Sequence, residues 1–230
     1  MFLECQNINF RYPNGSMDVF HDLSFQMKTP GFHALFGPSG VGKTSLARII
    51  VGDFNDYSGV VRSKGMQNLL YSYNLERLPD WSSVGKHLEK ITPPSLRDRK
   101  DELVASFDMA QTMGLRFSQL SLGQRNRVNL IRYLLQDFHL LIMDESLANV
   151  DERTREKIIM RIKEMFPDTY FLYISHNVIE VSTYCRDILV FRNPRKSPQV
   201  VTVNGRDRKL GEAVAKDHLE HTMLEIMHAS

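Results

Sequence analysis

The chain has little cysteine. Its 230 residues include only two, Cys5 and Cys185, and these have no metal-ligand spacing. Metal sites built from cysteine need several of these residues at short, regular intervals. A cysteine-based metal site is therefore excluded, and a reducing compartment is a simpler explanation than a disulfide.

Long apolar runs are also absent. A transmembrane helix needs about 20 consecutive apolar residues, and no segment approaches that length. The first ten residues, MFLECQNINF, carry no basic stretch ahead of their apolar residues. We therefore expect no signal peptide, and we expect any association with a membrane to come through a partner.

A strong net charge is missing as well. The chain has 29 Lys and Arg residues against 27 Asp and Glu residues, which gives a formal charge of +2. Proteins that bind nucleic acid or a membrane surface through charge alone carry a marked basic excess. We accordingly expect no nucleic-acid partner.

What is present indicates a globular α/β protein. The length suits one large domain, residues 1–230, or one domain with a small inserted lobe. Between residues 32 and 191 strand-like and helix-like patterns alternate, which predicts a largely parallel sheet covered by helices. Expected strands are 2–12, 18–27, 32–36, 59–63, 68–73, 139–145, 169–176 and 187–191. Expected helices are 43–52, 120–135, 151–166 and 213–227.

One internal stretch differs from the rest of the chain in its pattern of polar and apolar residues. Residues 82–118 are polar and helical in pattern, and they contain the pair Pro93-Pro94. We interpret them as a small, mostly helical subdomain inserted into the α/β domain. Residues 205–230 are expected to form a C-terminal helical tail.

The segment FHALFGPSGVGKTSLARII concentrates glycine between a predicted strand and a predicted helix. Glycine costs backbone entropy on folding, so such a cluster needs a reason. The spacing matches GxxxxGK[ST], in which backbone N–H groups and a helix N-terminus cradle phosphate. Lysine then reaches the β- and γ-phosphates, and the threonine hydroxyl is a ligand for Mg²⁺. The predicted nucleotide-binding residues here are Gly37, Pro38, Ser39, Gly40, Val41, Gly42, Lys43, Thr44 and Ser45.

Two acids follow a buried strand in LLIMDE. In open α/β sheets ligands bind beyond the carboxyl ends of the strands, where Asp144 and Glu145 lie. Asp144 is predicted to hold Mg²⁺, through water, and Glu145 to polarise an attacking water. The alternative is that both are helix-capping acids on a loop.

A second helix start in LSLGQRNRV combines a hydroxyl with a glycine. Ser121 and Gly123 would form a second anion site, although this signal is weak when taken alone. The arginines Arg125, Arg127 and Arg132 could form a nucleic-acid patch. A solvated helix face is the better interpretation, because no aromatic stripe is interleaved with them.

The order GPSGVGKT, LSLGQ, LLIMDE and a lone histidine in YISHN resembles the ATP-binding cassette (ABC) ATPases. The resemblance covers nearly the whole chain. It implies a P-loop NTPase core of α/β class with a mixed, mainly parallel sheet, an N-terminal antiparallel β portion and a small inserted helical subdomain. It also implies ATP and Mg²⁺ as cofactors, bound between two copies arranged head to tail.

The same resemblance assigns further residues. Ser121, Gly123 and Gln124 would contact the γ-phosphate bound by a second copy, while His176 would contact that phosphate and the attacking water. Tyr12 matches the aromatic residue that stacks on adenine, and residues 149–151 match a dimer-contact loop. The alternative for His176 is a histidine at the entry of a helix. From the residues alone, Tyr12 could as well be a core tyrosine at the end of a strand.

Two positions depart from the family pattern. The signature usually reads LSGGQ, whereas its third position here is Leu122, whose side chain could crowd a phosphate. The family has a glutamine that senses Mg²⁺, and this chain has Asn74 at the matching position. Asparagine keeps the amide but is one methylene shorter, so its contact with the metal is in question.

The resemblance implies an ATPase subunit of a membrane transporter. ERLPDWSSV is similar to a segment of importers of the nitrate, taurine and sulfonate class. The implied partners are a second copy and transmembrane permease subunits, which would place the chain in the cytoplasm on the inner face of the membrane. We expect the permease to contact residues 74–90, where Trp81 lies unless it is a core tryptophan.

Three other functions remain open at this point. A soluble ABC ATPase of DNA repair or translation usually carries long insertions or tandem cassettes, which are missing here. A P-loop small-molecule kinase would need neither residues 120–124 nor Glu145. A binding-only subunit would have lost turnover through Leu122 and Asn74. No residue encodes the transported solute, because a nucleotide-binding chain never touches it.

Overall fold

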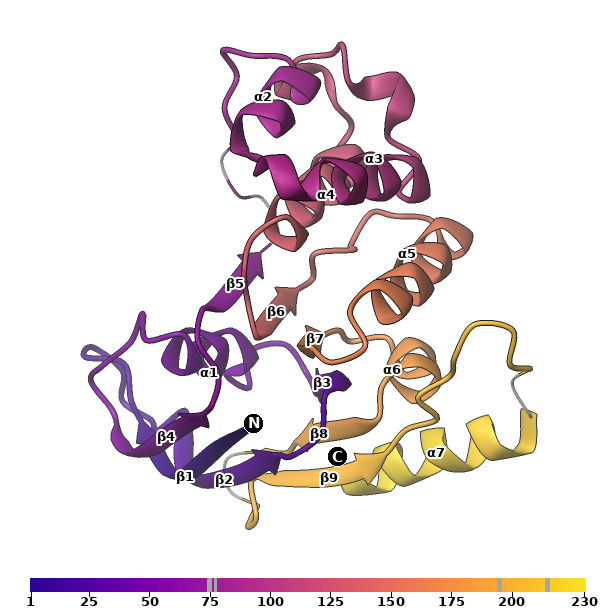
Figure 1. The fold of residues 1–230 in the computed structure, drawn as a ribbon. Helices are drawn as coiled ribbons and strands as arrows, with labels where there is room; N and C mark the ends of the chain where they lie inside the picture. The colour runs from indigo at the N-terminus through magenta and orange to yellow at the C-terminus, as the bar shows by residue number, and fades with distance from the viewer. Residues whose placement is uncertain (74–75, 77, 194–195, 214–215) are drawn as a thin grey trace. The chain divides into compact units, whose positions relative to one another are not determined.

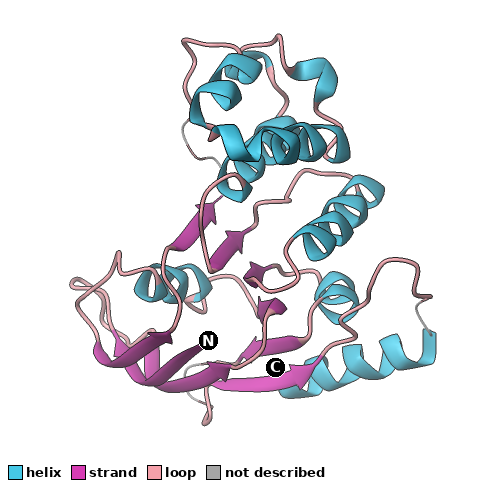
Figure 2. Cartoon of the chain, viewed as in Figure 1, coloured by secondary structure: helices cyan, strands magenta, loops and turns pink. Residues whose placement is uncertain are grey.

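The computed structural model describes residues 1–73, 76, 78–193, 196–213 and 216–230. The chain forms two compact units, coloured along the sequence in Figure 1. We call Met1–Tyr71, His139–Asp144 and Pro167–Ser230 the sheet unit. We call Ser72–Phe138 and Glu145–Phe166 the helical unit. Apart from the end of one strand, the regular structure among the described residues of the helical unit is helix (Figure 2).

The larger sheet has the strand order β5-β6-β7-β3-β8-β9. β6 pairs with β7, β7 with β3 and β3 with β8 in parallel, whereas β9 pairs with β8 antiparallel. Every residue of β6 and β7 is buried, as is typical of parallel strands inside a sheet. The bounds are β3 Gly31–Phe36, β5 Leu69–Tyr73, β6 Leu140–Asp144, β7 Tyr170–Ile174, β8 Asp187–Phe191 and β9 Val200–Asn204.

The smaller sheet is antiparallel and has the order β2-β1-β4. Its strands are β1 Phe2–Phe10, β2 Phe20–Met27 and β4 Ser58–Lys64. Along β1, Leu3, Cys5, Ile8 and Phe10 are buried, and they join one core with residues of the larger sheet and of α1. This packing buries the apolar face of helix α1, Lys43–Ile50, where Leu46 and Ile49 are almost fully covered.

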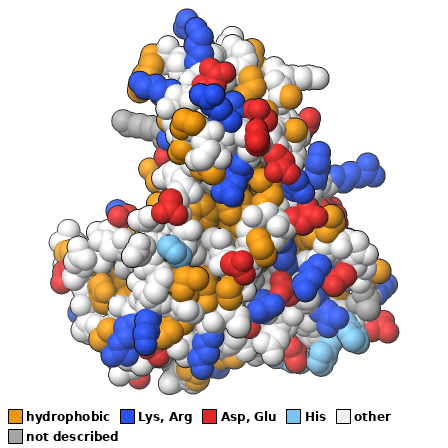
Figure 3. Space-filling model, viewed as in Figure 1, with side chains coloured by type: hydrophobic (Ala, Val, Ile, Leu, Met, Phe, Trp, Pro, Cys, Tyr) orange, Lys and Arg blue, Asp and Glu red, His pale blue; other side chains and the backbone are white. Residues whose placement is uncertain are grey.

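Two further helices belong to the described part of the sheet unit. α6, Val178–Tyr184, follows β7, and the closing helix α7, Lys216–Ala229, contacts both α6 and β9. Within the described residues no helix is long and apolar enough to span a bilayer. On the face drawn in Figure 3, cationic and acidic side chains are interspersed, so this face creates no extended field of one sign.

The described residues of the helical unit include four α-helices. α4 contacts α2 and α3, and α3 also contacts α5. Val84, Leu88, Leu103, Phe107 and Phe117 are buried in its interior. The bounds are α2 Val84–Ile91, α3 Arg97–Ser106, α4 Leu122–Leu134 and α5 Glu152–Met165, with 3₁₀ turns at Pro94–Leu96, Ala110–Thr112 and Phe117–Gln119.

The fold class predicted from the sequence is confirmed: the main sheet is mixed and mainly parallel, and the N-terminal sheet is antiparallel. Two elements were not expected. α6 is rich in β-branched residues, which disfavour helices, but Asn177 caps it by accepting from the N–H groups of Ile179 and Glu180. β9 follows a proline-containing turn and is held by its antiparallel pairing with β8.

Candidate functional site

The glycine-rich loop connects β3 to α1 and can be built only with glycine at two points. Gly42 has φ 101°, and a Cβ there would lie 2.6 Å from Val19 Cγ1 and from Phe20 Cε1. A Cβ at Gly37 would lie 2.9 Å from Phe191 Cβ. Side chains of the neighbouring strands and turn therefore pack directly against the loop and restrict its backbone conformation.

The N-terminus of α1 is open to an anion. Gly42 caps the helix without any side-chain hydrogen bond, and the first turn contains no acidic residue. The first N–H groups of a helix have no partner within the helix, and its dipole is positive at this end. A phosphate is the ligand that such a terminus suits.

Lys43 brings a positive charge to the same loop. Its Nζ donates to the carbonyl oxygens of Gly37 and Pro38, at 2.8 Å each. The ammonium group is thus held against the loop by the residues that begin it. A lysine held in this way supplies a compact point charge for phosphate.

Asp144 lies at the end of β6 and meets Thr44 from α1. Thr44 Oγ1 donates to Asp144 Oδ2 at 2.7 Å, although the two residues are far apart in the sequence. A second donor, Tyr71 Oη on β5, lies 2.8 Å from the same oxygen. Burial, and then the neighbouring Asp144 carboxylate, raise the pKa of Tyr71 above its ordinary value, so the phenol is protonated at neutral pH.

Tyr12 stands beside the loop with its ring partly exposed, at 46% of the residue surface. Its hydroxyl is 2.7 Å from Ser45 Oγ, which is buried in the first turn of α1. Its ring meets Phe10 edge-on at 5.0 Å between centroids, and Phe54 edge-on at 6.1 Å. These contacts fix an aromatic ring next to the start of α1.

His176 follows β7 at the same edge of the sheet. Ile174 pairs with Leu35 of β3 and with Asp144 of β6, so the carboxyl ends of three parallel strands meet there. His176 itself is exposed. The structure therefore brings the glycine-rich loop, Asp144 and the turn carrying His176 to one edge of the sheet unit.

A buried carboxylate supports the turn that carries His176. Glu180 Oε2 accepts from Tyr173 Oη at 2.9 Å and from Ser175 Oγ at 3.1 Å. Its Oε1 accepts from Asn177 Nδ2 at 3.1 Å. Residues on both sides of His176 are thus anchored to one acid.

In the helical unit, α4 begins with a capping box at the predicted signature segment. Ser121 Oγ accepts from Gln124 N at 3.2 Å, and Gln124 Oε1 accepts from Ser121 N at 2.8 Å. Gly123 lies so close to Asn149 that a Cβ would overlap the Asn149 carbonyl oxygen. The start of α4 therefore packs on the segment after the acidic pair.

Comparison with known proteins identifies the family. The family model described as "ABC transporter" matches residues 20–148. The chain belongs to the ABC transporter family. It is 30% identical over 220 residues to "Aliphatic sulfonates import ATP-binding protein SsuB 1" of Rhodococcus jostii (strain RHA1), covering 92% of this chain and 87% of that protein.

Other similar proteins agree with this assignment. "Taurine import ATP-binding protein TauB" of Pseudomonas savastanoi pv. phaseolicola is 29% identical over 230 residues, covering 92% of this chain and 87% of that protein. The solved "Structure of ATP binding subunit of ABC transporter" has a TM-score of 0.76 at 18% identity, covering 97% of this chain and all of that one. A bacterial Atm1-family ABC exporter with ATP bound has a TM-score of 0.78 at 19% identity, covering 99% of this chain and 41% of that one. The predicted resemblance to the nitrate, taurine and sulfonate importer class is confirmed, and as a family member the chain is an ATPase.

Glu145, which follows Asp144, has a strained backbone conformation. Its φ is 49°, in the left-handed region, and its carbonyl oxygen accepts from Ala148 N at 2.9 Å. Such a non-glycine residue costs roughly 1–3 kcal/mol and is concentrated at functional sites. Next to it, Ser146 Oγ donates to the Ser72 carbonyl at 3.0 Å and lies 3.1 Å from Ser72 Oγ, with both serines buried.

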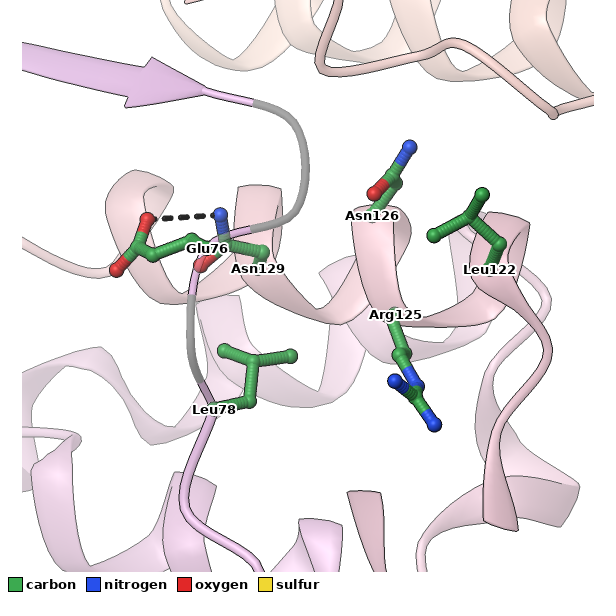
Figure 4. Close-up of a pocket in the computed structure, with 6 residues that line it drawn as sticks. All are labelled: Glu76, Leu78, Leu122, Arg125, Asn126 and Asn129. Carbon is green, nitrogen blue, oxygen red and sulfur yellow. Dashed lines mark hydrogen bonds between the residues drawn. The ribbon is translucent and has the colours of Figure 1, made fainter. Parts of the chain in front are cut away.

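A pocket on the helical unit contains Leu122, which departs from the ABC signature. Leu122 is 37% exposed, so its side chain is accommodated at the surface of α4. Figure 4 shows the hydrogen bond from Asn129 Nδ2 to Glu76 Oε2, 2.9 Å long, at this pocket. Its lining residues are Glu76, Leu78, Leu122, Arg125, Asn126 and Asn129.

Asn74, the other departure, lies outside the described residues. Glu76, two positions later, is anchored to α4: besides the bond from Asn129, its Oε2 accepts from Tyr133 Oη at 2.8 Å. Arg132 Nη1 donates to Glu76 Oε1 at 3.4 Å. Burial, and then the hydrogen bond to Glu76, raise the pKa of Tyr133 above its ordinary value.

Sequence reasoning missed Tyr71, Glu180 and Glu76. Each is a polar residue in or beside an apolar segment, and that signal could have drawn attention to them. Their partners lie on elements whose spatial neighbours no local pattern reveals. The sequence alone could therefore have marked these residues without saying what they contact.

Proposed function

We propose that this chain is the ATP-hydrolysing subunit of a bacterial importer for a small solute. The main support for ATP hydrolysis in this proposal is the hydrogen bond from Thr44 Oγ1 to Asp144 Oδ2. It joins the helix of the glycine-rich loop to a buried carboxylate at the carboxyl edge of the sheet. The importer part is supported by the relatives named as import ATP-binding proteins.

The substrate ATP binds along the glycine-rich loop. Residues 37–45 and the N-terminus of α1 hold its phosphates through N–H groups, and Lys43 binds the β- and γ-phosphate oxygens. The exposed ring of Tyr12 stacks on adenine. An adenine on that ring adds apolar contact while its edges stay in water.

The residues present also fit Mg²⁺. Among the described residues no three His, Cys, Asp or Glu side chains converge on a metal position. Mg²⁺ does not require such a cage, since it keeps several waters and binds one or two protein oxygens plus substrate phosphates. Thr44 and Asp144 would hold it, with Asn74 as a third candidate, and the ion would offset charge on the phosphates.

The remaining predicted site residues have roles in the hydrolysis of ATP. Glu145 accepts the proton of a water that attacks the γ-phosphorus, and the bond to the β–γ bridging oxygen breaks to leave ADP and phosphate. His176 contacts the γ-phosphate and orients that water. Ser121, Gly123 and Gln124 bind the γ-phosphate held by a second copy, so the active form is a head-to-tail homodimer.

The dimer drives a membrane partner. Residues 74–90 contact the permease, and Trp81, 85% exposed, is available for that contact. The chain would then act in the cytoplasm at the inner face of the membrane. We retain 1–230 as one ABC domain, with 82–118 as its helical subdomain and 205–230 as its C-terminal tail.

Steady-state ATP hydrolysis tests this assignment. Wild type should release phosphate from Mg·ATP, Lys43→Ala should lose ATP binding, and Glu145→Gln should bind ATP but not turn it over. Size-exclusion chromatography should show the E145Q variant as a dimer in ATP and a monomer without it. An E145Q chain that remains monomeric at saturating ATP, or a K43A chain with wild-type turnover, would contradict the proposal.

A further inference from the structure

We propose that Tyr71 is a positioning residue of the magnesium site, which holds the Asp144 carboxylate in its binding orientation. This inference rests on the proposed function, because it assumes that Asp144 holds Mg²⁺. Tyr71 Oη donates to Asp144 Oδ2 at 2.8 Å. Nothing in the nucleotide-binding motifs points to this tyrosine.

Tyr71 and Asp144 both lie on strands of the larger sheet. Tyr71 lies on β5 and Asp144 ends β6, and these strands are neighbours in the larger sheet. The Tyr71 ring is half-buried and packs against the core of the sheet unit. A side chain locked by packing on a strand positions its partner more accurately than one on a loop.

The hydrogen bonds select one carboxylate oxygen. Tyr71 and Thr44 both donate to Asp144 Oδ2, at 2.8 and 2.7 Å. Within the part of the chain that the structure describes, Oδ1 has no hydrogen bond. Two donors on Oδ2 therefore fix the rotation of the carboxylate and leave Oδ1 for the ion or its waters.

Such support matters for this cation in particular. Mg²⁺ demands near-ideal octahedral geometry, so a carboxylate that rotates freely binds it poorly. Hydrogen bonds that orient a ligand typically change metal affinity by about 10- to 100-fold. Thr44 is itself a proposed ligand of the ion. Tyr71, in contrast, is proposed to act on the ion through its hydrogen bond to Asp144.

The test is a Mg²⁺ titration of nucleotide binding, which requires no turnover. Fluorescent methylanthraniloyl-ADP is bound first in EDTA and then at rising Mg²⁺, for wild type and Tyr71→Phe. The Y71F variant keeps the ring and removes only the phenol oxygen. We expect its affinity in EDTA to stay within about twofold of wild type, while the Mg²⁺ concentration at half-effect rises about tenfold or more.

Two controls separate the possible failures. Tyr57→Phe makes the same chemical change at a partly buried tyrosine whose hydroxyl has no hydrogen bond among the described residues, and it should titrate as wild type. Asp144→Asn should shift the half-effect at least as far as Y71F. The double variant Y71F/D144N should shift it no further than D144N, because Tyr71 acts through Asp144.

The outcomes are distinct. An unchanged Mg²⁺ half-effect in Y71F, or an equal loss of affinity with and without Mg²⁺, overturns the role of Tyr71. A wild-type titration in D144N contradicts the proposed magnesium site instead. If Y71F is too unstable to titrate, Tyr71→His keeps a ring with a hydrogen-bond donor: a half-effect near wild type supports the proposal, and a shift as large as that of D144N overturns it.

Discussion

Gly123 packs directly against the backbone carbonyl of Asn149, with no room between them for a side chain. The contact joins the first turn of α4, where the signature segment lies, to the segment that follows the acidic pair. Asn126 Nδ2 reinforces it by donating to the Ala148 carbonyl at 2.8 Å. Any movement of α4 relative to residues 148–150 must break this packing.

Gly123→Ala should therefore destabilise the helical unit. The added methyl group would overlap a backbone atom, which cannot rotate away, and overpacking of this kind costs about 1–3 kcal/mol. Urea unfolding should show the loss, and ATP turnover should fall with it. Leu122→Ala, one position earlier at a surface site, should change the free energy of unfolding by less than about 0.5 kcal/mol; equal losses in both variants would contradict the argument.

Gly42→Ala should be more damaging than its backbone conformation alone explains. Gly42 has φ 101° and is crowded by Val19 and Phe20, whereas Gly52 has φ 86° with open space around it. Gly52→Ala should lower the free energy of unfolding only by the cost of a left-handed backbone with a Cβ, about 1–2 kcal/mol. Unfolding and ADP binding of the two variants should differ, with nucleotide binding lost only in G42A. Similar behaviour of both would show that crowding at the loop is unimportant.

Thr44→Val should remove the hydroxyl while keeping the shape of the side chain. Asp144 then loses one of its two donors, and a proposed metal ligand disappears. We expect turnover to fall at least as far as the roughly 10- to 100-fold loss that follows removal of an outer-shell partner. Thr202→Val, at an exposed position of β9, is the matched control and should keep wild-type turnover. Full activity of T44V would argue against the metal role of Thr44.

Glu180→Ala should impair turnover more than nucleotide binding. The variant leaves Tyr173, Ser175 and Asn177 without their shared acceptor, so the turn that presents His176 loosens. Steady-state kinetics should show a lower kcat with little change in KM. Glu180→Gln should be intermediate, since it keeps one oxygen but turns an amide group toward Asn177 Nδ2. A variant at the exposed Glu220 of α7 should behave as wild type; a uniform loss of ATP binding in E180A would instead indicate a general packing role.

Asp187 should make the stability of the sheet unit sensitive to acid. His33 Nδ1 lies 3.0 Å from Asp187 Oδ2, and this contact, with a smaller contribution from Arg186, holds the pKa of Asp187 below its ordinary value. A lowered pKa contributes stability that is complete above the unfolded value, about 3.9 for aspartate, and is lost as the pH falls through the folded value. Asp187→Asn should cost stability at pH 7, and the difference from wild type should shrink below about pH 4. A difference that is constant with pH in urea unfolding would contradict this assignment.

The sequence predicted the elements that have a strong local pattern. The strands that became β3, β6 and β7 are short apolar runs, and the helices that became α1, α4 and α5 have apolar residues at helical spacing. α6 was missed because Val178, Ile179, Val181 and Thr183 are β-branched and typical of strands. Its helix forms because the Asn177 cap and burial against neighbouring elements outweigh that propensity.

The contacts of the candidate site divide in the same way. The glycine-rich loop and Asp144 were identified from the sequence, and the structure brings Thr44 and Asp144 into contact. Tyr71 was not identified, because its contact with Asp144 depends on β5 lying beside β6. That neighbour relation joins segments about 70 residues apart, and no short-range pattern encodes it.

By itself, the sequence determined the position of the glycine-rich loop and which segments become strands, because glycine's backbone freedom and the spacing of apolar residues are local properties of the chain. Only the tertiary structure decided which side chains support that chemistry: Tyr71 behind Asp144, Glu180 behind the His176 turn and Asn149 against Gly123. These pairs follow from strand order and core packing, which minimise exposed apolar surface over a whole unit and so cannot be worked out one segment at a time.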